Sequence, residues 1–396
     1  MSEDDFAAAK ENGDAAAALD LFRWLSREVR ELMPREVPVL ETPPTALTFS
    51  RDFVAANRPC VVKRAVDHWP ARELWTASYL SAALGDTRVS VNVTPTGLGD
   101  ALLSTEGWDV RFRGEPPPNA SDATGAAAPA KPPLVFVQPE ARRMRFSEFR
   151  ALVREQSRKA EDTVSSSRNP RAIAYVSAQN DSFAAEYASR LGADLAGDAA
   201  SGLDWARGAF GAAPDAVNVW CGPHDAVTSF HRDHYENVYV VLRGRKTFTL
   251  LPPCDAWRME PRDAPSARFE YVETEANDLK CRVAVDAPVS NVTWPSTTPA
   301  SVRRDGGPPA FVVTVHAGET LYLPAMWYHH VAQGASDDAS DESESDDSLH
   351  TIAVNFWHDM RFDDRFATAR FLETACERTR RLDSEGVARK GPRAPF

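Results

Sequence analysis

The sequence has few cysteines and no long apolar run. Its 396 residues contain five scattered cysteines and no CxxC pair, so neither a zinc finger nor a disulfide framework is expected. The longest apolar stretches, such as 238–242, are too short to cross a membrane. The first residues are acidic and polar, unlike a targeting peptide. We therefore expect a protein of the cytoplasm, with the nucleus as a second compartment, and no membrane partner.

Positive charge is scarce as well. The 45 Lys and Arg residues are outnumbered by 57 Asp and Glu residues, which gives a formal net charge of −12. This balance argues against a nucleic-acid partner. Much of the excess lies in residues 337–347, which carry seven carboxylates and no base. We interpret this run as a solvated loop, the alternative being a docking site for a basic partner.

Five segments follow one another along the chain. The composition predicts a disordered N-terminus (1–15), a helix with its connector (16–45), a supporting α/β region (46–214), a β core (215–360) and a C-terminal helical region (361–396). The α/β region contains a flexible Pro- and Ala-rich insertion at 114–133, and the β core contains the acidic loop at 335–348.

Short strands with period-2 patterning dominate the sequence after residue 215. They are expected at 217–221, 238–242, 246–251, 311–315, 320–324, 327–332 and 352–357. Many short strands separated by turn signals predict an antiparallel barrel or jelly roll. Helical spacing of apolar residues predicts flanking helices at 16–33, 72–84, 146–158 and 363–382. The expected fold class is mainly β with flanking α.

Two short motifs in this core have the residue types of a metal site. His231 and Asp233 form an HxD triplet, and in a strand these two side chains would share a face. The His pair 329–330 on a later strand is the candidate for a third ligand. Two histidines and one carboxylate are the ligands of non-haem Fe(II) oxygenases, which leave positions open for co-substrate and O₂. The alternative is a set of ordinary polar residues at strand ends.

Three further residues belong to the same expected strands. Lys246 begins a strand, and a lysine pointing into a metal-holding barrel needs an anion such as the distal carboxylate of 2-oxoglutarate. An exposed strand-end lysine is the alternative. Asn355 and Trp357 share one face of the last strand, where a buried Asn needs hydrogen-bond partners. Simple core packing is the alternative for the Trp.

Long runs of sequence carry a family resemblance. Residues 228–253, 318–331 and 352–357 resemble the jumonji-C (JmjC) oxygenases. The runs 57–71, 89–101, 174–180, 215–220 and 355–363 make the chain most similar to the jumonji domain-containing protein seven family of lysyl hydroxylases. The resemblance extends from about residue 45 to 370. It implies a double-stranded β-helix, the cupin-type jelly roll, with N- and C-terminal helices.

The resemblance also implies a ligand set. Fe(II) would be held by His231, Asp233 and His329, with the first histidine of the pair taking the metal, and 2-oxoglutarate and O₂ would be co-substrates. The distal carboxylate of 2-oxoglutarate would be bound by Thr228, Tyr175 and Lys246. Hydrogen bonds near its metal-bound end would come from Asn237 and Asn355, and the pocket would be lined by the aromatic Trp357.

The implied reaction is hydroxylation of a lysine side chain in a protein substrate, specifically a GTPase of the developmentally regulated GTP-binding type. Three alternatives remain open at this point. They are demethylation of N-methyl-lysine or N-methyl-arginine in histones, cleavage of methylated tails as a peptidase, and a catalytically inactive JmjC scaffold. The resemblance further implies a homodimer formed through residues 363–382, the alternative being a helix that only packs on its own barrel. Segments at 114–133, 296–309 and 335–348 resemble insertions relative to compact relatives, which leaves the substrate in question.

Overall fold

The computed structural model describes residues 15–113, 132–162, 172–273, 279–334 and 349–389. The expected N-terminal disorder, most of the Pro- and Ala-rich insertion and the acidic loop lie outside these residues, and the segment bounds stay predictions. None of the helices in the described part is long and apolar enough to cross a membrane.

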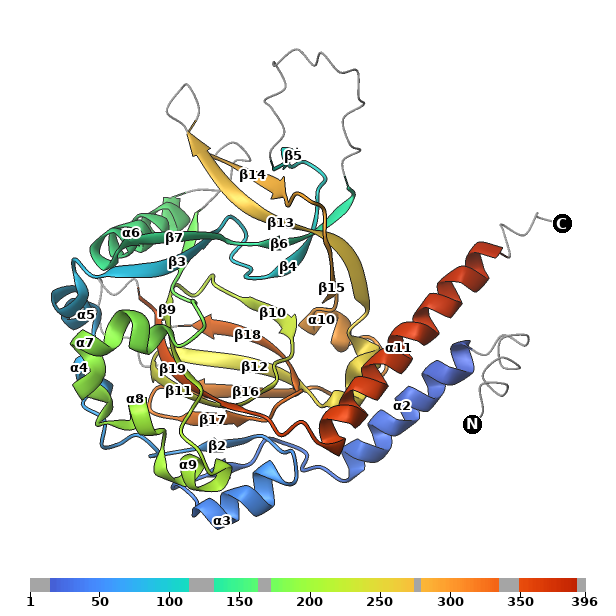
Figure 1. Ribbon diagram of the computed structural model, residues 1–396, viewed down its shortest axis with the longest axis horizontal. Coiled ribbons are helices and arrows are strands. Elements are labelled where there is room, and N and C mark those ends of the chain that lie inside the picture. Colours follow the sequence, from blue (N-terminus) through green and yellow to red (C-terminus); the bar gives the residue numbers. More distant parts are fainter. Residues whose placement is uncertain (1–14, 114–131, 163–171, 274–278, 335–348, 390–396) are drawn as a thin grey trace.

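Two sheets face each other at the centre of the molecule (Figure 1). Their inward side chains, among them Val241, Phe248, Val315 and Leu321, form one apolar cluster between the sheets. In spatial order the larger sheet contains β1 (Val39–Leu40), β2 (Cys60–Val62), β17 (Thr320–Leu323), β11 (Tyr235–Arg243), β19 (Thr351–Asp359) and β9 (Ala216–Gly222). The smaller contains β10 (Thr228–His231), β18 (Tyr328–Gly334), β12 (Arg245–Leu251) and β16 (Phe311–His316).

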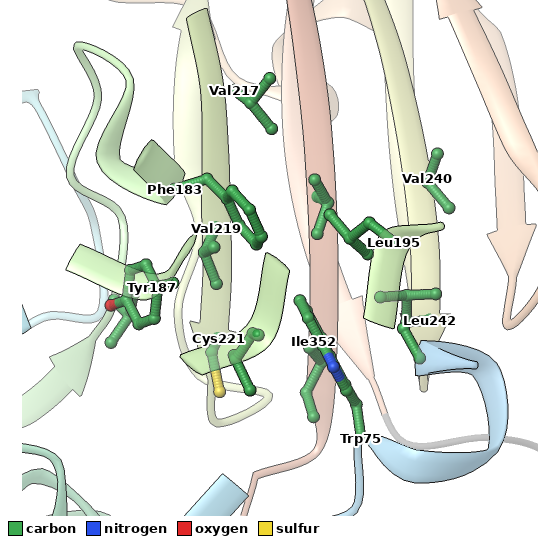
Figure 2. Packing of buried hydrophobic residues seen from close by; sticks show 14 of the residues in the cluster. Trp75, Phe183, Tyr187, Leu195, Val217, Val219, Cys221, Val240, Leu242 and Ile352 are labelled. Atoms are coloured by element: carbon green, nitrogen blue, oxygen red, sulfur yellow. The ribbon is translucent and has the colours of Figure 1, made fainter. Parts of the chain in front are cut away.

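The outer face of the larger sheet is covered by short helices. Successive side chains of a strand alternate between faces, so Val217, Val219 and Cys221 of β9 point outward together. Figure 2 shows these side chains packed beside Leu195, Ile352 and Trp75. The covering and connecting helices are α3 (Ala46–Phe49), α4 (Ala71–Leu74), α5 (Ala77–Leu84), α6 (Phe146–Asp162), α7 (Ala188–Leu191), α8 (Asp198–Ser201) and α9 (Asp204–Phe210).

A further sheet lies over one side of the barrel (Figure 1). It has its own apolar cluster, which includes Val137, Phe269 and Val283. Its strands are β4 (Ala101–Ser104), β6 (Leu134–Gln138), β13 (Pro261–Glu273), β14 (Leu279–Val285) and β5 (Val110–Phe112), with β15 (Asn291–Pro295) paired to β13. Because β15 also contacts β10 and β6, this upper sheet reaches the strand that carries His231.

A small third layer and two long helices complete the fold. The strands β7 (Glu140–Arg145), β3 (Arg88–Thr94) and β8 (Ile173–Tyr175) form a three-stranded sheet. The helices α2 (Ala15–Glu31) and α11 (Asp364–Arg389) lie side by side and both contact the 3₁₀ helix 253–258 (Figure 1). A short helix, α10 (Pro299–Val302), lies within the segment 296–309.

The predicted fold class is confirmed, because the chain is mostly β with flanking helices and forms a jelly roll. Each of the seven strands expected after residue 215 is found, with bounds shifted by up to three residues. The helices expected at 16–33, 146–158 and 363–382 are also present. The helix expected at 72–84 is wrong in part, because Trp75 adopts a non-helical conformation and divides it into α4 and α5. The upper sheet was not expected.

Candidate metal centre

Two neighbouring strands of the smaller sheet bring the ligands together. His231 is the last residue of β10 and lies directly opposite His329 of β18. Asp233 does not share this strand, so the expected strand geometry of the HxD triplet is wrong. The chain leaves β10 after His231, and the Met326 N–H donates to the Asp233 carbonyl at 2.9 Å. This turn still directs the carboxylate toward both histidines.

The three side chains form a compact group of potential ligand atoms. The Asp233 Oδ2 atom lies 3.6 Å from Nε2 of His231 and 3.6 Å from Nε2 of His329. The ligand atoms of the three residues all lie within 4.8 Å of one another. Arg232, between the first two, instead pairs with Glu373 of α11 at 3.0 Å. Thus two histidines and one carboxylate converge on one point, as predicted.

Backbone carbonyls fix the tautomer of both histidines. Nδ1 of His231 lies 2.9 Å from the Ser229 carbonyl, and Nδ1 of His329 lies 3.0 Å from the Trp327 carbonyl. Because a carbonyl only accepts, each Nδ1 carries hydrogen and donates, which leaves the Nε2 lone pair for a metal. The donor set therefore fits the two-histidine, one-carboxylate site of Fe(II).

The charges of these groups also suit a cation. Burial favours a higher pKa for Asp233, but the neighbouring His231, His329 and His234 together lower the pKa to about 2. Burial and the charge of His231 lower the pKa of His329 to about 4. Burial would lower the pKa of His231 too, yet Asp233 raises it above its usual value. At neutral pH Asp233 and His329 are thus in the ligating state.

Lys246 supplies a buried positive charge inside the same barrel. It shares its inward face of β12 with Phe248 and Leu250 and is only 2% exposed. Its ammonium donates to the Tyr175 hydroxyl at 2.8 Å and to the side-chain oxygen of Gln333. Within the described residues no carboxylate pairs with it, and burial lowers its pKa to about 7. A buried ammonium with only neutral partners favours binding of an anion.

Comparison with known proteins agrees with this geometry. The chain matches the cupin-like domain family over residues 46–364. It is 37% identical to the lysine-specific demethylase JMJ32 of Arabidopsis thaliana over 365 residues, which cover 88% of this chain and 90% of that protein. It is 33% identical to the human bifunctional peptidase and (3S)-lysyl hydroxylase JMJD7, covering 91% of this chain and 97% of the relative. The JmjC domain-containing protein E of Dictyostelium discoideum is 32% identical, with coverage of 89% and 93%.

The chain belongs to the JmjC family of cupin-like proteins. The resemblance found in the sequence is therefore confirmed, and with it membership of a family of oxygenases that use Fe(II) and 2-oxoglutarate. The His-Asp-His group lies within the matched residues and is able to hold the metal.

The remaining residues expected to bind the co-substrate lie on the inner faces of both sheets. Thr228 pairs with Val331, which places it on the inner face of the smaller sheet. On the larger sheet, which faces Thr228 across the barrel, the Asn355 amide of β19 donates to Asn237 of the neighbouring strand β11 at 3.1 Å. Trp357 stacks on Tyr235 with ring centroids 4.7 Å apart. The structure thus joins Lys246 directly to Tyr175 and Asn355 to Asn237, while Trp357 contacts a neighbour on β11.

Three inner-face residues were not expected from the sequence. Gln333 accepts a hydrogen bond from Lys246 because β12 and β18 pair these two residues directly. The Trp220 indole donates to Asn355 at 2.9 Å. The hydroxyl of Tyr239 is hydrogen-bonded to the hydroxyl of Tyr175. Only Gln333 had a signal in the sequence, since it lies four residues after His329 and therefore on the same face of that strand.

Proposed function

We propose that this JmjC protein is an Fe(II)- and 2-oxoglutarate-dependent hydroxylase that acts on a lysine side chain of a protein substrate. The observation that carries the proposal is the pairing of two features in one barrel. A two-histidine, one-carboxylate group with free Nε2 lone pairs lies on β10 and β18. A buried ammonium without a carboxylate partner among the described residues lies on the adjacent strand β12.

Each residue then has a distinct role. His231, Asp233 and His329 hold Fe(II), and Lys246, Tyr175 and Thr228 bind the distal carboxylate of 2-oxoglutarate. Asn237 and Asn355 provide hydrogen bonds nearer the metal. Fe(II) bound there would supply, with 2-oxoglutarate and O₂, the oxidising power to hydroxylate an unactivated carbon, with succinate and CO₂ as the other products. The protein holds the reactants in place and limits access of water, since the His329 side chain is only 6% exposed.

Lysine hydroxylation is supported by similarity along nearly the whole chain. The human relative named a (3S)-lysyl hydroxylase is covered over 97% of its length. The acidic net charge of −12 is complementary to a basic target. By the family resemblance we propose that the lysine belongs to a GTPase of the developmentally regulated GTP-binding type. We propose that enzyme and substrate meet in the cytoplasm, with the nucleus as a second compartment.

Demethylation is the second candidate, and one observation favours it. The relative with 37% identity is named a lysine-specific demethylase. The same metal centre would hydroxylate an N-methyl carbon, and the product would release formaldehyde. Peptidase activity, which the name of the human relative includes, has no dedicated nucleophile in the sequence. An inactive scaffold is disfavoured because every group needed to hold metal and co-substrate is present.

The deciding experiment compares the products of one reaction. The purified protein is incubated with Fe(II), 2-oxoglutarate, O₂ and a GTPase of the proposed class, and in parallel with N-methylated histone peptides. We expect a mass increase of one oxygen atom on a lysine of the GTPase and no formaldehyde from the peptides. Formaldehyde with loss of a methyl group, and no oxygen added to the GTPase, would establish the demethylase instead.

We further propose that the protein forms a homodimer through its two long helices. One face of α11 packs on its own barrel, since Phe366 and Ala369 contact Met326 and Met360. Other apolar side chains of the helix pair stay exposed, with Leu21 at 60%, Trp24 at 55% and Phe371 at 68%. Large exposed apolar residues gathered on neighbouring helices are typical of an interface.

Light scattering during gel filtration tests the dimer. We expect the mass of two chains for the native protein and of one chain for a Trp24→Asp, Phe371→Asp double variant. The matched control is Leu47→Asp, which changes a comparably exposed side chain, at 74%, on α3, a helix that packs against α9. A single-chain mass for the native protein would contradict the proposal.

A further inference from the structure

A carboxylate near the metal centre takes no part in holding the metal. The segment 97–100 runs beside the chain that enters β10, with the Gly99 N–H donating to the Val227 carbonyl at 2.9 Å. This close approach requires glycine at position 97, where φ is +79° and a side-chain carbon would lie 2.1 Å from the Asp225 carbonyl oxygen. The Ser229 hydroxyl donates to the Asp100 carbonyl. Asp100 is thereby fixed beside the residue two positions before His231.

Asp100 has neither of the usual roles of a carboxylate near a metal. It is not in the group of ligand atoms, which contains only His231, Asp233 and His329 among the described residues. It does not orient the imidazole of His231, because Nδ1 of that ring is bonded to Ser229 and Nε2 faces Asp233. Its side chain is hydrogen-bonded to Gln138 of β6, and its charge acts on His231. No Lys or Arg in the described part of the chain forms an ion pair with it.

Aromatic rings adjoin this carboxylate. Trp294 of β15 stacks on His231 with ring centroids 6.4 Å apart and an interplanar angle of 7°. Its indole N–H donates to the Ser229 hydroxyl at 3.1 Å, the same hydroxyl that holds Asp100. Phe136 of β6 packs on Trp294 at 4.8 Å. The upper sheet thus places two aromatic rings, the Gln138 amide and the Asp100 carboxylate on the His231 side of the metal centre.

This combination suits a flexible apolar chain that ends in a cation. The methylenes of such a chain pack on aromatic rings, and its charged end pairs with a carboxylate. The Asp100 side chain is partly exposed, so it is accessible to an incoming group. Burial raises its pKa above the usual value, which indicates that the carboxylate lacks full hydration and gains from a cationic partner.

We propose that Asp100, supported by Gln138 and Trp294, is the subsite that binds the ammonium of the substrate lysine. The inference rests on the proposed lysyl hydroxylase function and adds the residue that selects the cationic side chain. In this arrangement the metal and Lys246 bind the co-substrate, and the upper sheet binds the target. The competing explanation is structural, in which Asp100 only ties the 97–100 segment to β6 through Gln138.

Asp100→Asn separates these explanations because it keeps the shape and a hydrogen-bond acceptor for Gln138 but removes the charge. Asp100→Glu keeps the charge. Asp263→Asn is the control, since Asp263 is an exposed carboxylate on β13 that pairs with Arg381 and accepts from Thr293, the neighbour of Trp294 on the opposite face of β15. All three variants are compared with the native protein for folding by circular dichroism.

The measurement is nuclear relaxation with Mn(II) in place of Fe(II) and 2-oxoglutarate present. Two probes are used: Nα-acetyl-lysine methylamide and Nα-acetyl-norleucine methylamide, which has a similar apolar chain but no ammonium. Paramagnetic relaxation of probe methylene protons reports binding near the metal without any turnover. We expect the native protein and Asp263→Asn to bind the lysine probe about tenfold more tightly than the norleucine probe.

We expect Asp100→Asn to bind both probes equally and Asp100→Glu to recover part of the preference. An undiminished lysine preference in Asp100→Asn, or no preference in the native protein, would overturn the subsite while leaving the hydroxylase proposal standing. Failure of Mn(II) to relax the protons of 2-oxoglutarate itself in the native protein would overturn both proposals together.

Discussion

The barrel and the upper sheet meet at His231 but differ in how they are built. The barrel pairs nearly all of its strands in antiparallel fashion, such as β12 with β16 and β18, around one apolar cluster. The upper sheet joins β6 to β13 and β5 to β14 in parallel, from segments more than 120 residues apart, around a separate cluster. The groups proposed to bind metal and co-substrate belong to the barrel, apart from Tyr175 on β8 of the three-stranded sheet, whereas the upper sheet holds the groups proposed to meet the target.

This difference assigns separate functions to separate cores. The reaction chemistry is a property of the barrel, because His231, His329 and Lys246 are held by strand pairing within one small sheet. The proposed substrate subsite belongs to a sheet that contacts this barrel through β15. Changes in the barrel should therefore abolish binding of metal or co-substrate, and changes in the upper sheet should leave both intact.

The largest effect is expected from Asp233→Ala. Removing the only carboxylate of the ligand group leaves two neutral nitrogens, which hold Fe(II) poorly. We expect protein-bound iron and hydroxylation both to fall to background, measured by metal analysis after gel filtration and by mass spectrometry. His234→Ala, which changes the adjacent exposed histidine, is the control and should keep both. Full activity of Asp233→Ala would refute the assigned ligand set.

Lys246→Met should separate binding from stability. We expect the affinity for 2-oxoglutarate to fall by roughly 30- to 1,000-fold, because the distal carboxylate loses its buried partner. The protein without ligand should become more stable, since a buried ammonium with neutral partners is replaced by an apolar chain. Calorimetric titration and denaturant unfolding measure the two. Lys63→Met, which alters a surface lysine paired with Glu41, should change neither.

The pH dependence of Lys246 gives a third test. Its pKa is about 7 in the folded protein against 10.5 for the free side chain, so the unfolded chain binds more protons between these values. Stability of the ligand-free protein contributed by this residue should therefore rise with pH across that window. Affinity for 2-oxoglutarate should fall above about pH 7, where the free site loses its proton. Lys246→Met should abolish both trends, and their persistence in the variant would assign them to another group.

The smallest effect on the metal centre is expected from Phe269→Ala in the upper sheet. Phe269 is fully buried, so its truncation should destabilise that sheet by about 3–5 kcal/mol. Binding of Fe(II) and 2-oxoglutarate should stay unchanged while binding of the lysine probe weakens. Phe248→Ala, an equally buried change on the strand of Lys246, should weaken 2-oxoglutarate binding. Equal loss of co-substrate binding in both variants would show that the two cores act as one.

The same contrast explains how much the sequence could predict. The strands of the barrel were expected because β11, β12 and β19 carry short β-type runs bounded by turns, and HxD and the His pair have the residue types of a metal site. The upper sheet was missed because its longest strand, β13, contains two prolines and several charged residues instead of a β-type run. Asp100 had no signal either, since its position depends on the close approach of Gly97 to the chain that enters β10. The turn that carries Asp233 was likewise invisible, because a side chain can converge on a metal from outside a strand.

The central claim is that His231, Asp233 and His329 hold Fe(II) while the barrel also holds 2-oxoglutarate. Anaerobic titration of the native protein with both, followed by visible spectroscopy, tests it most directly. We predict a weak charge-transfer band of the iron–2-oxoglutarate chelate in the native protein and none in His231→Ala. A folded native protein without the band, or an undiminished band in His231→Ala, would contradict the account.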